Sequence, residues 1–282
     1  MSRTAIRVSA VIGLALVWPF AMGIASEANG ADDSFRLLKL NGHHVKWGDR
    51  ALGVGATVRY AFVDAPRRFD GARNCRVLVP LEGLAAGHGI ALSTLEDEAA
   101  AAFRVWEEAA DISFDRVDDP ERADILIGAQ GRPVGRAYAN VQYQPGSHDG
   151  VKAIDQALIC LNPQQRWKVG FDGDTDVYDI RYTLVHEIGH AIGLDHPGPS
   201  GQVMSFRYSE QYRDLQPGDF RGVQLLYGAS PGTMTADTSA DPSGDNAGEL
   251  PSAEDIGSGL IQLDLRSEDH RAGCRFLAMS SC

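Results

Sequence analysis

Apolar residues between Ser93 and Ala110 recur at steps of three or four, the spacing that gathers them on one face of a helix. The positions on this face are Leu95, Ala99, Phe103, Trp106 and Ala110. Ser93 and Glu96 have the spacing of a capping box, in which each side chain satisfies a backbone N–H at the helix start. We therefore predict an amphipathic helix over Ser93–Ala110 that begins at this box and packs its apolar face on a core.

Other segments have the patterns of helices or strands. We predict helices over Ile180–Leu194 and Pro217–Tyr227, the second closed by Gly228. Thr57–Phe62 alternates as a strand does, and Asp124–Ala129 contains a continuous apolar run that suits a strand buried on both faces. The remaining predicted strands are Ile112–Val117, Gly135–Tyr143 and Ala157–Leu161. This mixture of strands and helices predicts an α+β fold.

The N-terminal residues have the pattern of a signal peptide. Arg3 and Arg7 precede the mostly apolar run Val8–Ile24, and small residues follow it. We predict that residues 1–28 are a signal peptide, removed on export. An uncleaved membrane anchor is the alternative, although the run is short for a span and contains Pro19. No later segment is long and apolar enough to cross a bilayer, so no stable span is expected after the signal is removed.

Composition divides the rest of the chain into three parts. Residues 32–228 have the periodic patterns of a folded domain. Residues 229–255 are rich in small residues, proline and aspartate, and we predict a flexible acidic linker. Residues 256–282 regain apolar side chains but are too few to bury a core alone. We expect this tail to dock on the domain or on a partner, or to be held by its two cysteines.

Charge and cysteine content narrow the class of protein. The 282 residues have a net charge of −12 without a basic cluster, so nucleic-acid binding is not expected. Four cysteines in an exported chain favour disulfides, and three pairings are possible. We favour Cys75–Cys160 with Cys274–Cys282, because the last two lie close together in the tail. The sequence leaves the other pairings open.

One short segment combines imidazoles and a carboxylate in a pattern suited to zinc. His186 and His190 are four residues apart, so they share one face of a helix and can reach the same metal. Gly193 can end the helix with a positive φ and turn the chain back, which brings in His196 as a third ligand. Three protein ligands leave the fourth position of a catalytic zinc open for water. Glu187, beside the first ligand, is placed to accept a proton from that water.

With the glycine and the third histidine at fixed offsets, this pattern resembles the signature of the metzincin metallopeptidases. Met204, eight residues after His196, matches the methionine turn that completes the signature, and it is implied to support the site. The alternative interpretation is a pair of histidines on an ordinary helix and a methionine of the core. The pairing of the two motifs favours the metzincin interpretation.

Within the metzincins, the chain resembles the matrixins over roughly Lys46–Gly228. The segment Ala99–Trp106 is similar to the first matrixin helix, and Leu215–Gly228 is similar to the last. Two residues differ from the matrixin or the serralysin pattern. Pro197 is serralysin-like, whereas Phe206 stands where a serralysin has a tyrosine ligand.

The resemblance implies that residues 32–228 form a catalytic domain. Its fold would be a twisted, mostly parallel five-stranded sheet with one antiparallel edge strand and three helices. A peptide substrate would lie extended beside that edge strand and pair with it through backbone hydrogen bonds. Tyr182, one turn before His186, is implied to bound the pocket for the residue after the cleaved bond, with a core tyrosine as the alternative.

An acidic loop precedes the same helix. Asp172, Asp174 and Asp176 alternate there, and Asp179 follows. Alternating carboxylates can chelate calcium, which makes a calcium ion a possible second cofactor. The loop lacks a glutamate at the EF-hand distance, and a solvated turn is the alternative.

Together these features predict a secreted zinc metalloendopeptidase. It would act on proteins or peptides as a monomer outside the cytoplasm, in the extracellular space or the periplasm. Zinc would be its cofactor, and Glu187 its general base. The alternative function is a zinc-bearing binding module, or a latent protease regulated by its C-terminal tail.

Overall fold

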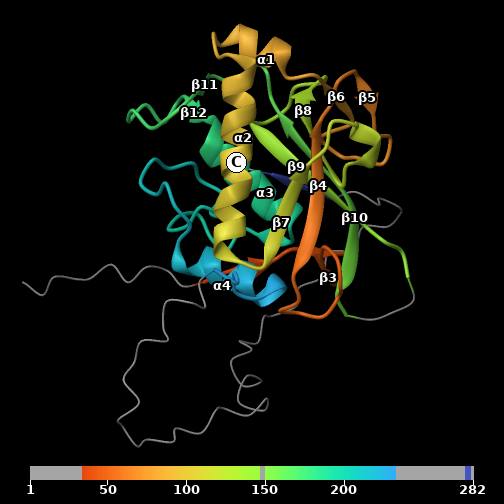
Figure 1. Ribbon diagram of the computed structural model, residues 1–282. Helices are drawn as coiled ribbons and strands as arrows, with labels where there is room; N and C mark the ends of the chain where they lie inside the picture. The colour runs from red at the N-terminus through yellow and green to blue at the C-terminus, as the bar shows by residue number, and fades with distance from the viewer. Residues whose placement is uncertain (1–33, 147–149, 233–276, 281–282) are drawn as a thin grey trace, which may run out of the picture. The chain divides into compact units, whose positions relative to one another are not determined.

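The computed structural model describes residues 34–146, 150–232 and 277–280 (Figure 1). The predicted signal peptide, most of the predicted linker and both cysteines of the tail lie outside the described residues. The helices are α1 (Glu82–Gly87), α2 (Leu92–Ala109), the short 3₁₀ helix η1 (Pro120–Arg122), α3 (Ile180–Ala191) and α4 (Pro217–Tyr227).

A mostly parallel sheet forms the centre of the fold. Its strands lie in the order β9 (Ala137–Tyr143), β10 (Lys152–Leu161), β8 (Ile125–Gln130), β4 (Ala56–Phe62) and β7 (Ile112–Arg116). The last four run parallel, and β9 is antiparallel to β10. This confirms the expected mostly parallel sheet with an antiparallel strand, although further strands extend it beyond five. A further strand, β14 (Leu277–Ser280), pairs antiparallel with the outer side of β9.

Shorter strands complete the fold around this sheet. They are β1 (Arg36–Leu37), β2 (Lys39–Leu40), β3 (His43–Lys46), β5 (Arg67–Arg68), β6 (Val77–Val79), β11 (Trp167–Lys168), β12 (Tyr178–Asp179) and β13 (Leu194–Asp195). β3 extends the parallel register beside the start of β10, and β6 runs antiparallel to the end of β8. β1 pairs with β13 and so ties the first described residues to the segment that follows α3.

The sheet buries side chains on both faces, as the continuous apolar run in β8 predicts. Ile125 and Ile127 belong to the larger apolar cluster, which also contains the core-facing residues of α2, α3 and α4. Leu126 points the other way, into a smaller cluster with Cys75 and Cys160. Alternation along a strand sends successive side chains to opposite faces, so β8 is buried on both faces.

The predicted amphipathic helix is α2, which lies along the front of the molecule in Figure 1. Its apolar stripe is buried, and the indole Nε1 of Trp106 donates to the Val185 carbonyl at 2.9 Å, linking α2 to α3. The predicted capping box is wrong. The helix begins at Leu92 after Ala91, with no side-chain cap, because Leu92 packs on the core and brings Ser93 inside the first turn.

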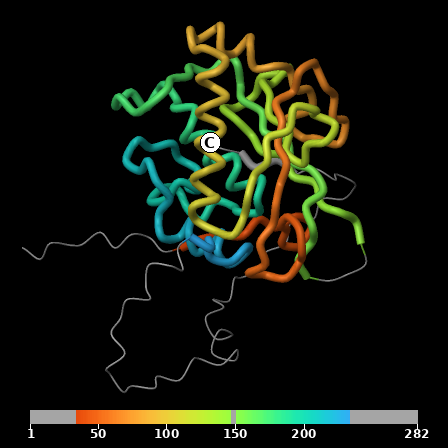
Figure 2. The backbone as a smooth tube through the Cα atoms, in the orientation of Figure 1, coloured from red at the N-terminus to blue at the C-terminus, as the bar shows by residue number. Residues whose placement is uncertain are grey.

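The last long helix, α4, has the predicted bounds Pro217–Tyr227 and ends at Gly228 with φ +84°. Its buried Tyr227 hydroxyl donates to the Ile192 carbonyl at 2.7 Å and accepts from the Trp47 N–H at 3.0 Å. The tube in Figure 2 shows the first described residues beside α4, although the two are far apart in the sequence. Both segments therefore hold the chain just after α3.

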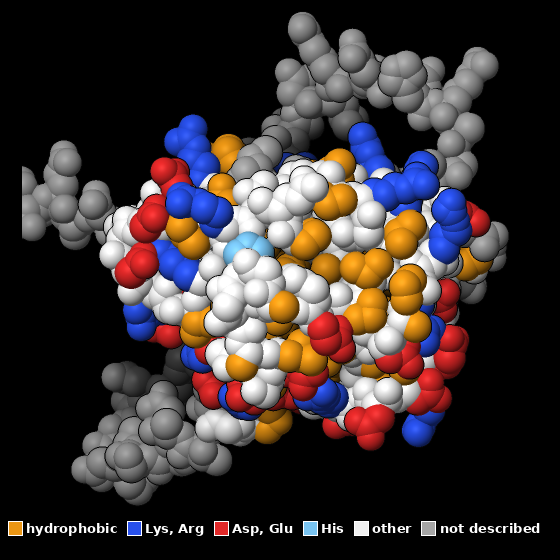
Figure 3. Space-filling view, turned by 90° about the horizontal axis from the view of Figure 1, so that it is seen from above, with side chains coloured by type: hydrophobic (Ala, Val, Ile, Leu, Met, Phe, Trp, Pro, Cys, Tyr) orange, Lys and Arg blue, Asp and Glu red, His pale blue; other side chains and the backbone are white. Residues whose placement is uncertain are grey.

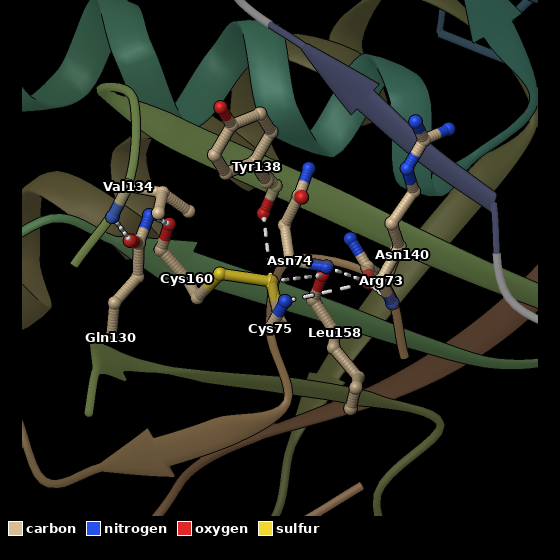
Figure 4. The surroundings of a disulfide bond; sticks show 9 residues. All are labelled: Arg73, Asn74, Cys75, Gln130, Val134, Tyr138, Asn140, Leu158 and Cys160. Atoms are coloured by element: carbon tan, nitrogen blue, oxygen red, sulfur yellow. Dashed lines mark hydrogen bonds between the residues drawn. A yellow bond between two sulfur atoms is a disulfide. The ribbon is translucent and has the colours of Figure 1, made fainter. Parts of the chain in front are cut away.

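A disulfide joins Cys75 to Cys160, as favoured from the sequence. It ties the loop before β6 to the middle of the sheet (Figure 4). The side-chain oxygen of Asn140, a residue of β9, accepts from the backbone N–H groups of Arg73, Asn74 and Cys75 in that loop. The loop is thus fixed to β9 by hydrogen bonds and to β10 by the covalent link.

Both signs of charge occur on the surface shown in Figure 3, where apolar side chains gather between acidic and basic ones. The net charge of −12 is therefore not laid out as one acidic field over this face. In the described part of the chain, none of the helices has the length and apolarity needed to cross a membrane.

Candidate metal centre and active site

α3 carries the first two histidines and is fixed at its start by Asp179. The Asp179 carboxylate accepts from the Tyr182 N–H at 2.7 Å, as an N-cap does, and from the Gly170 N–H at 2.6 Å. Burial raises the pKa of this carboxyl, and the two backbone bonds oppose that shift. Asp179 therefore caps α3 and is not part of the acidic loop that precedes it in the sequence.

Helix α3 ends two residues before Gly193, which has φ +106°. A side chain at this position would also collide with the Val45 carbonyl, so both the turn and the packing require glycine. The chain reverses here, and Asp195 forms an ion pair with Arg36 at 3.0 Å. This reversal brings His196 back to the two histidines of the helix.

The three imidazoles converge on one point. His196 Nε2 lies 3.0 Å from the Nε2 atoms of both His186 and His190, and the three possible ligand atoms lie within 4.8 Å of one another. The other ring nitrogen of each helical histidine faces a carbonyl. His186 Nδ1 lies 2.7 Å from the Val203 oxygen, and His190 Nδ1 lies 2.8 Å from the Leu194 oxygen.

This donor set fits a zinc ion. A carbonyl can only accept, so each helical histidine carries its proton on Nδ1 and turns the lone pair of Nε2 inward. One proton on His196 could satisfy only one of these two nitrogens, whereas a cation can be shared by all three. Imidazole nitrogens in a group of three are the ligands of a catalytic zinc with an open fourth position.

Electrostatics also favours neutral ligands. Burial lowers the pKa of His186 well below its usual range, and the neighbouring imidazoles lower it further. Burial likewise lowers the pKa of His190 to about 4 and that of His196 to about 3. The imidazoles are therefore uncharged near neutral pH, which is the state that binds a metal.

Glu187 is fully buried next to His186 in the sequence and on the helix. Met204 is buried against α3 at Gly189. A side chain at Gly189 would overlap the Met204 sulfur and the Trp106 ring. The turn that contains Met204 is held by Asp219 of α4. The Asp219 carboxylate accepts from the Val203 N–H at 3.0 Å and the Met204 N–H at 3.1 Å, a link that the sequence did not indicate.

Tyr182 belongs to an aromatic cluster beside the histidines. Its ring centroid lies 5.1 Å from that of Tyr208 and 6.0 Å from that of Phe171, and burial raises its pKa to about 12. Tyr182 and Val185 also line a cavity of about 280 Å³ between the start of α3 and α2. The ring is 6% exposed, so it packs in the core, and its role in a substrate pocket stays a prediction.

Arg136, which precedes β9, was not predicted from the sequence as a residue near the site. Its buried guanidinium lies 4.7 Å from the centroid of the Tyr178 ring and 5.7 Å from that of Tyr208. It places a positive charge near the imidazoles and contributes to the lowered pKa of His186 and His196. Only the fold could reveal this position, because Arg136 lies far from the helix in the sequence.

The acidic loop contains its own cation. Lys168 Nζ contacts the Asp172 carboxylate, the Asp174 carbonyl at 2.7 Å and Glu210 Oε1 at 2.5 Å. Burial lowers the pKa of Lys168, but these carboxylate partners outweigh it, and the net shift is upward. Asp176 contributes a backbone N–H to the Asp174 side chain at 3.0 Å. The ammonium group thus lies among the oxygens that a calcium ion would need.

Comparison with known proteins gives a consistent picture. The family model for matrixins matches residues 88–228, which are half of the chain. The chain is 27% identical to Metalloendoproteinase 5-MMP of Arabidopsis thaliana over 174 residues, which are 56% of this chain and 43% of that protein. It is 28% identical to Interstitial collagenase B of Mus musculus over 158 residues, 53% of this chain and 32% of that protein.

Similarity extends to a human protein. Over 149 residues, 50% of this chain and 29% of the relative, the chain is 30% identical to Stromelysin-3 of Homo sapiens. The match therefore covers less than half the length of each of these curated relatives.

Proposed function

Because the chain belongs to the matrixin family, we propose that it is a zinc-dependent endopeptidase whose zinc is held by His186, His190 and His196. The convergence of the three Nε2 atoms carries this proposal. The carbonyls of Val203 and Leu194 fix the tautomers of the helical pair, which is how proteins commonly orient zinc-binding imidazoles.

The mechanism follows from the residues around this point. When bound, zinc polarises a peptide carbonyl and lowers the pKa of a water molecule towards ~7. Glu187 accepts a proton from the water as its oxygen bonds to the carbonyl carbon, and delivers that proton to the amine nitrogen as the C–N bond breaks. Burial keeps the carboxylate away from bulk water. Met204 and Gly193 hold the site in shape and take no proton.

The proposed substrates are proteins or peptides outside the cytoplasm. The Cys75–Cys160 disulfide supports an oxidising compartment, and the pattern of residues 1–28 supports export. We propose that the enzyme works as a monomer with one catalytic zinc.

Glu187→Gln tests the mechanism. The amide keeps the size of the side chain but cannot accept the proton, so we expect kcat/KM to fall about 10²–10⁴-fold while zinc stays bound. The measurement is cleavage of a quenched-fluorescent peptide mixture by the purified chain, with zinc content determined by elemental analysis. A chelator should abolish cleavage by the parent chain, and added zinc should restore it.

Two results would contradict the proposal. Cleavage by the Gln variant at the parent rate would remove Glu187 from the mechanism. A parent chain that binds one zinc and cleaves no peptide in any form would favour the alternative of a zinc-bearing binding module.

A further inference from the structure

We propose that Leu277–Ser280 acts as an internal inhibitor by occupying the side of β9 on which an extended peptide substrate would pair. The inference rests on the proposed endopeptidase function, since it concerns access to that site. It assigns a role to a tail whose purpose neither the zinc motif nor the catalytic domain explains.

The strand pairing is the first observation. β14 runs antiparallel to β9, with Leu277 opposite Val141, Ala278 opposite Asn140, Met279 opposite Ala139 and Ser280 opposite Tyr138. β10 pairs with the other side of β9 over the same residues. A strand has only two hydrogen-bonding sides, so no second peptide can pair with β9 at these positions while β14 is in place.

The direction of β14 is the second observation. Its C-terminal end lies opposite Tyr138, near the start of β9 (Figure 4). Arg136, which directly precedes β9, contacts the aromatic cluster. Arg136 lies 5.7 Å from the ring centroid of Tyr208, which packs 5.1 Å from Tyr182, one turn before His186 on α3. α3 itself packs against β9. The tail strand therefore runs towards the start of β9, next to Arg136, whose charge acts on His186 and His196.

Tethering makes a short strand effective. Four residues of backbone pairing bind weakly when free, but a tether replaces free concentration by an effective concentration of about 1 mM. Residues 233–276 join Gly232 to Leu277, and a chain of about 44 residues could extend roughly 150 Å, ample to reach β9. An intrinsic dissociation constant of about 0.1–1 mM would leave the free form as roughly one half to one tenth of the molecules.

The test replaces Leu277–Ser280 with Gly-Ser-Gly-Ser in the full chain, which keeps the length and all four cysteines. Glycine and serine lower the tendency of the segment to form a strand. A matched control makes the same replacement at Leu260–Leu263, another short apolar stretch of the tail. We expect kcat/KM for a short reporter peptide to rise roughly two- to tenfold in the test variant only.

Hydrogen exchange supplies a second measurement that does not depend on activity. Amides of residues 137–143 that face β14 should exchange faster in the test variant than in the parent and the control. A synthetic peptide with the sequence of residues 276–281 should inhibit the test variant competitively at millimolar concentration, whereas a scrambled peptide should not.

Either of two outcomes overturns the inference. Unchanged exchange over residues 137–143 would show that the tail strand does not occupy β9. Faster exchange with unchanged kcat/KM would show that the occupied side is not on the substrate's path.

Failure of the proposed function gives a different result. If the zinc-loaded parent and the test variant both cleave nothing, the proposed proteolysis fails. Binding of a fluorescent extended peptide then decides the inference by itself. Tighter binding to the test variant than to the parent supports occupation of β9 by the tail, and equal binding refutes it.

Discussion

We propose that Tyr182 sets the size of the pocket for the residue after the cleaved bond. It lies one turn before His186 and lines the cavity of about 280 Å³ between α3 and α2. Tyr182→Leu removes the ring from this wall, so we expect the enzyme to accept longer side chains after the cleaved bond. The preference for long over short side chains at that position, measured with a peptide library as a ratio of kcat/KM values, should rise about 10-fold or more.

Tyr182→Phe is the matched control for this change. It keeps the ring and its contacts with Tyr208 and Phe171, so the preference should stay within about twofold of the parent. An unchanged preference in the Leu variant would assign Tyr182 to the core alone. Zinc content should be the same in all three proteins, because no ligand is altered.

The residues of the site differ in how far the sequence could predict them. His186 and His190 could be predicted as a pair of ligands because a helix brings residues four apart onto one face. The carbonyls that orient them were not, because Val203 and Leu194 are placed by the chain after the helix. Arg136 was missed for the same reason, since only the sheet brings it to the imidazoles.

Among the elements, the acidic loop offers the sharpest test. Lys168 holds the Asp172 carboxylate, the Asp174 carbonyl and Glu210, so its ammonium group competes for the oxygens that calcium would need. We expect the parent chain to show no thermal shift with calcium. Lys168→Met should create a weak site with a dissociation constant of about 0.1–1 mM, as in extracellular calcium modules. Calcium at ~5 mM would then stabilise this variant by about 1–2 kcal/mol.

The measurement is the melting temperature with and without calcium, and a rise of roughly 3–6 °C is expected for Lys168→Met alone. Lys168→Arg keeps the positive charge and should not respond. Adding Glu210→Gln to the Met variant should remove the response, because a carboxylate ligand is lost. A calcium response of the parent chain as large as that of the Met variant would refute the competition.

Secondary structure was predictable where a long periodic pattern coincides with packing. The bounds of α4 and the buried stripe of α2 follow from such patterns. The capping box at Ser93 failed because packing of Leu92 decides where the helix begins. The short α1 and two-residue strands such as β11 give too few positions for a period to be recognised, and they form only through their neighbours.

At the scale of the whole molecule, the order of the strands could not be derived from periodicity. The parallel pairing of β4 with both β7 and β8 brings together segments far apart in the chain. The likeness to matrixins predicted that most strands would be parallel, but not which strands would pair. The pairing of β14 with β9 was outside both arguments. Apolar residues in the tail indicate docking, but they do not indicate where.

The Cys75–Cys160 disulfide should contribute to the stability of the whole domain. Cys75 and Cys160 are 85 residues apart, and closing a loop of that length lowers the entropy of the unfolded chain by the equivalent of about 4–5 kcal/mol. Removing both with Cys75→Ala and Cys160→Ala should cost about 2–5 kcal/mol and lower the melting temperature by roughly 5–15 °C. Cys274→Ala with Cys282→Ala is the matched control and should change it far less.

Measuring kcat/KM of the same proteins shows whether the disulfide affects catalysis as well as the free energy of unfolding. The two cysteines belong to the smaller apolar cluster, whereas the apolar side chains of α3 belong to the larger one. At a temperature well below the transition, kcat/KM of the Cys75→Ala, Cys160→Ala variant should therefore stay within about twofold of the parent. Changes in one cluster have little effect on the residues of a separate one. Urea unfolding of the two proteins provides the free-energy difference. An equal midpoint for both would mean that the fold gains nothing from this link, and a loss of activity without a loss of stability would connect the disulfide to the zinc site through β9.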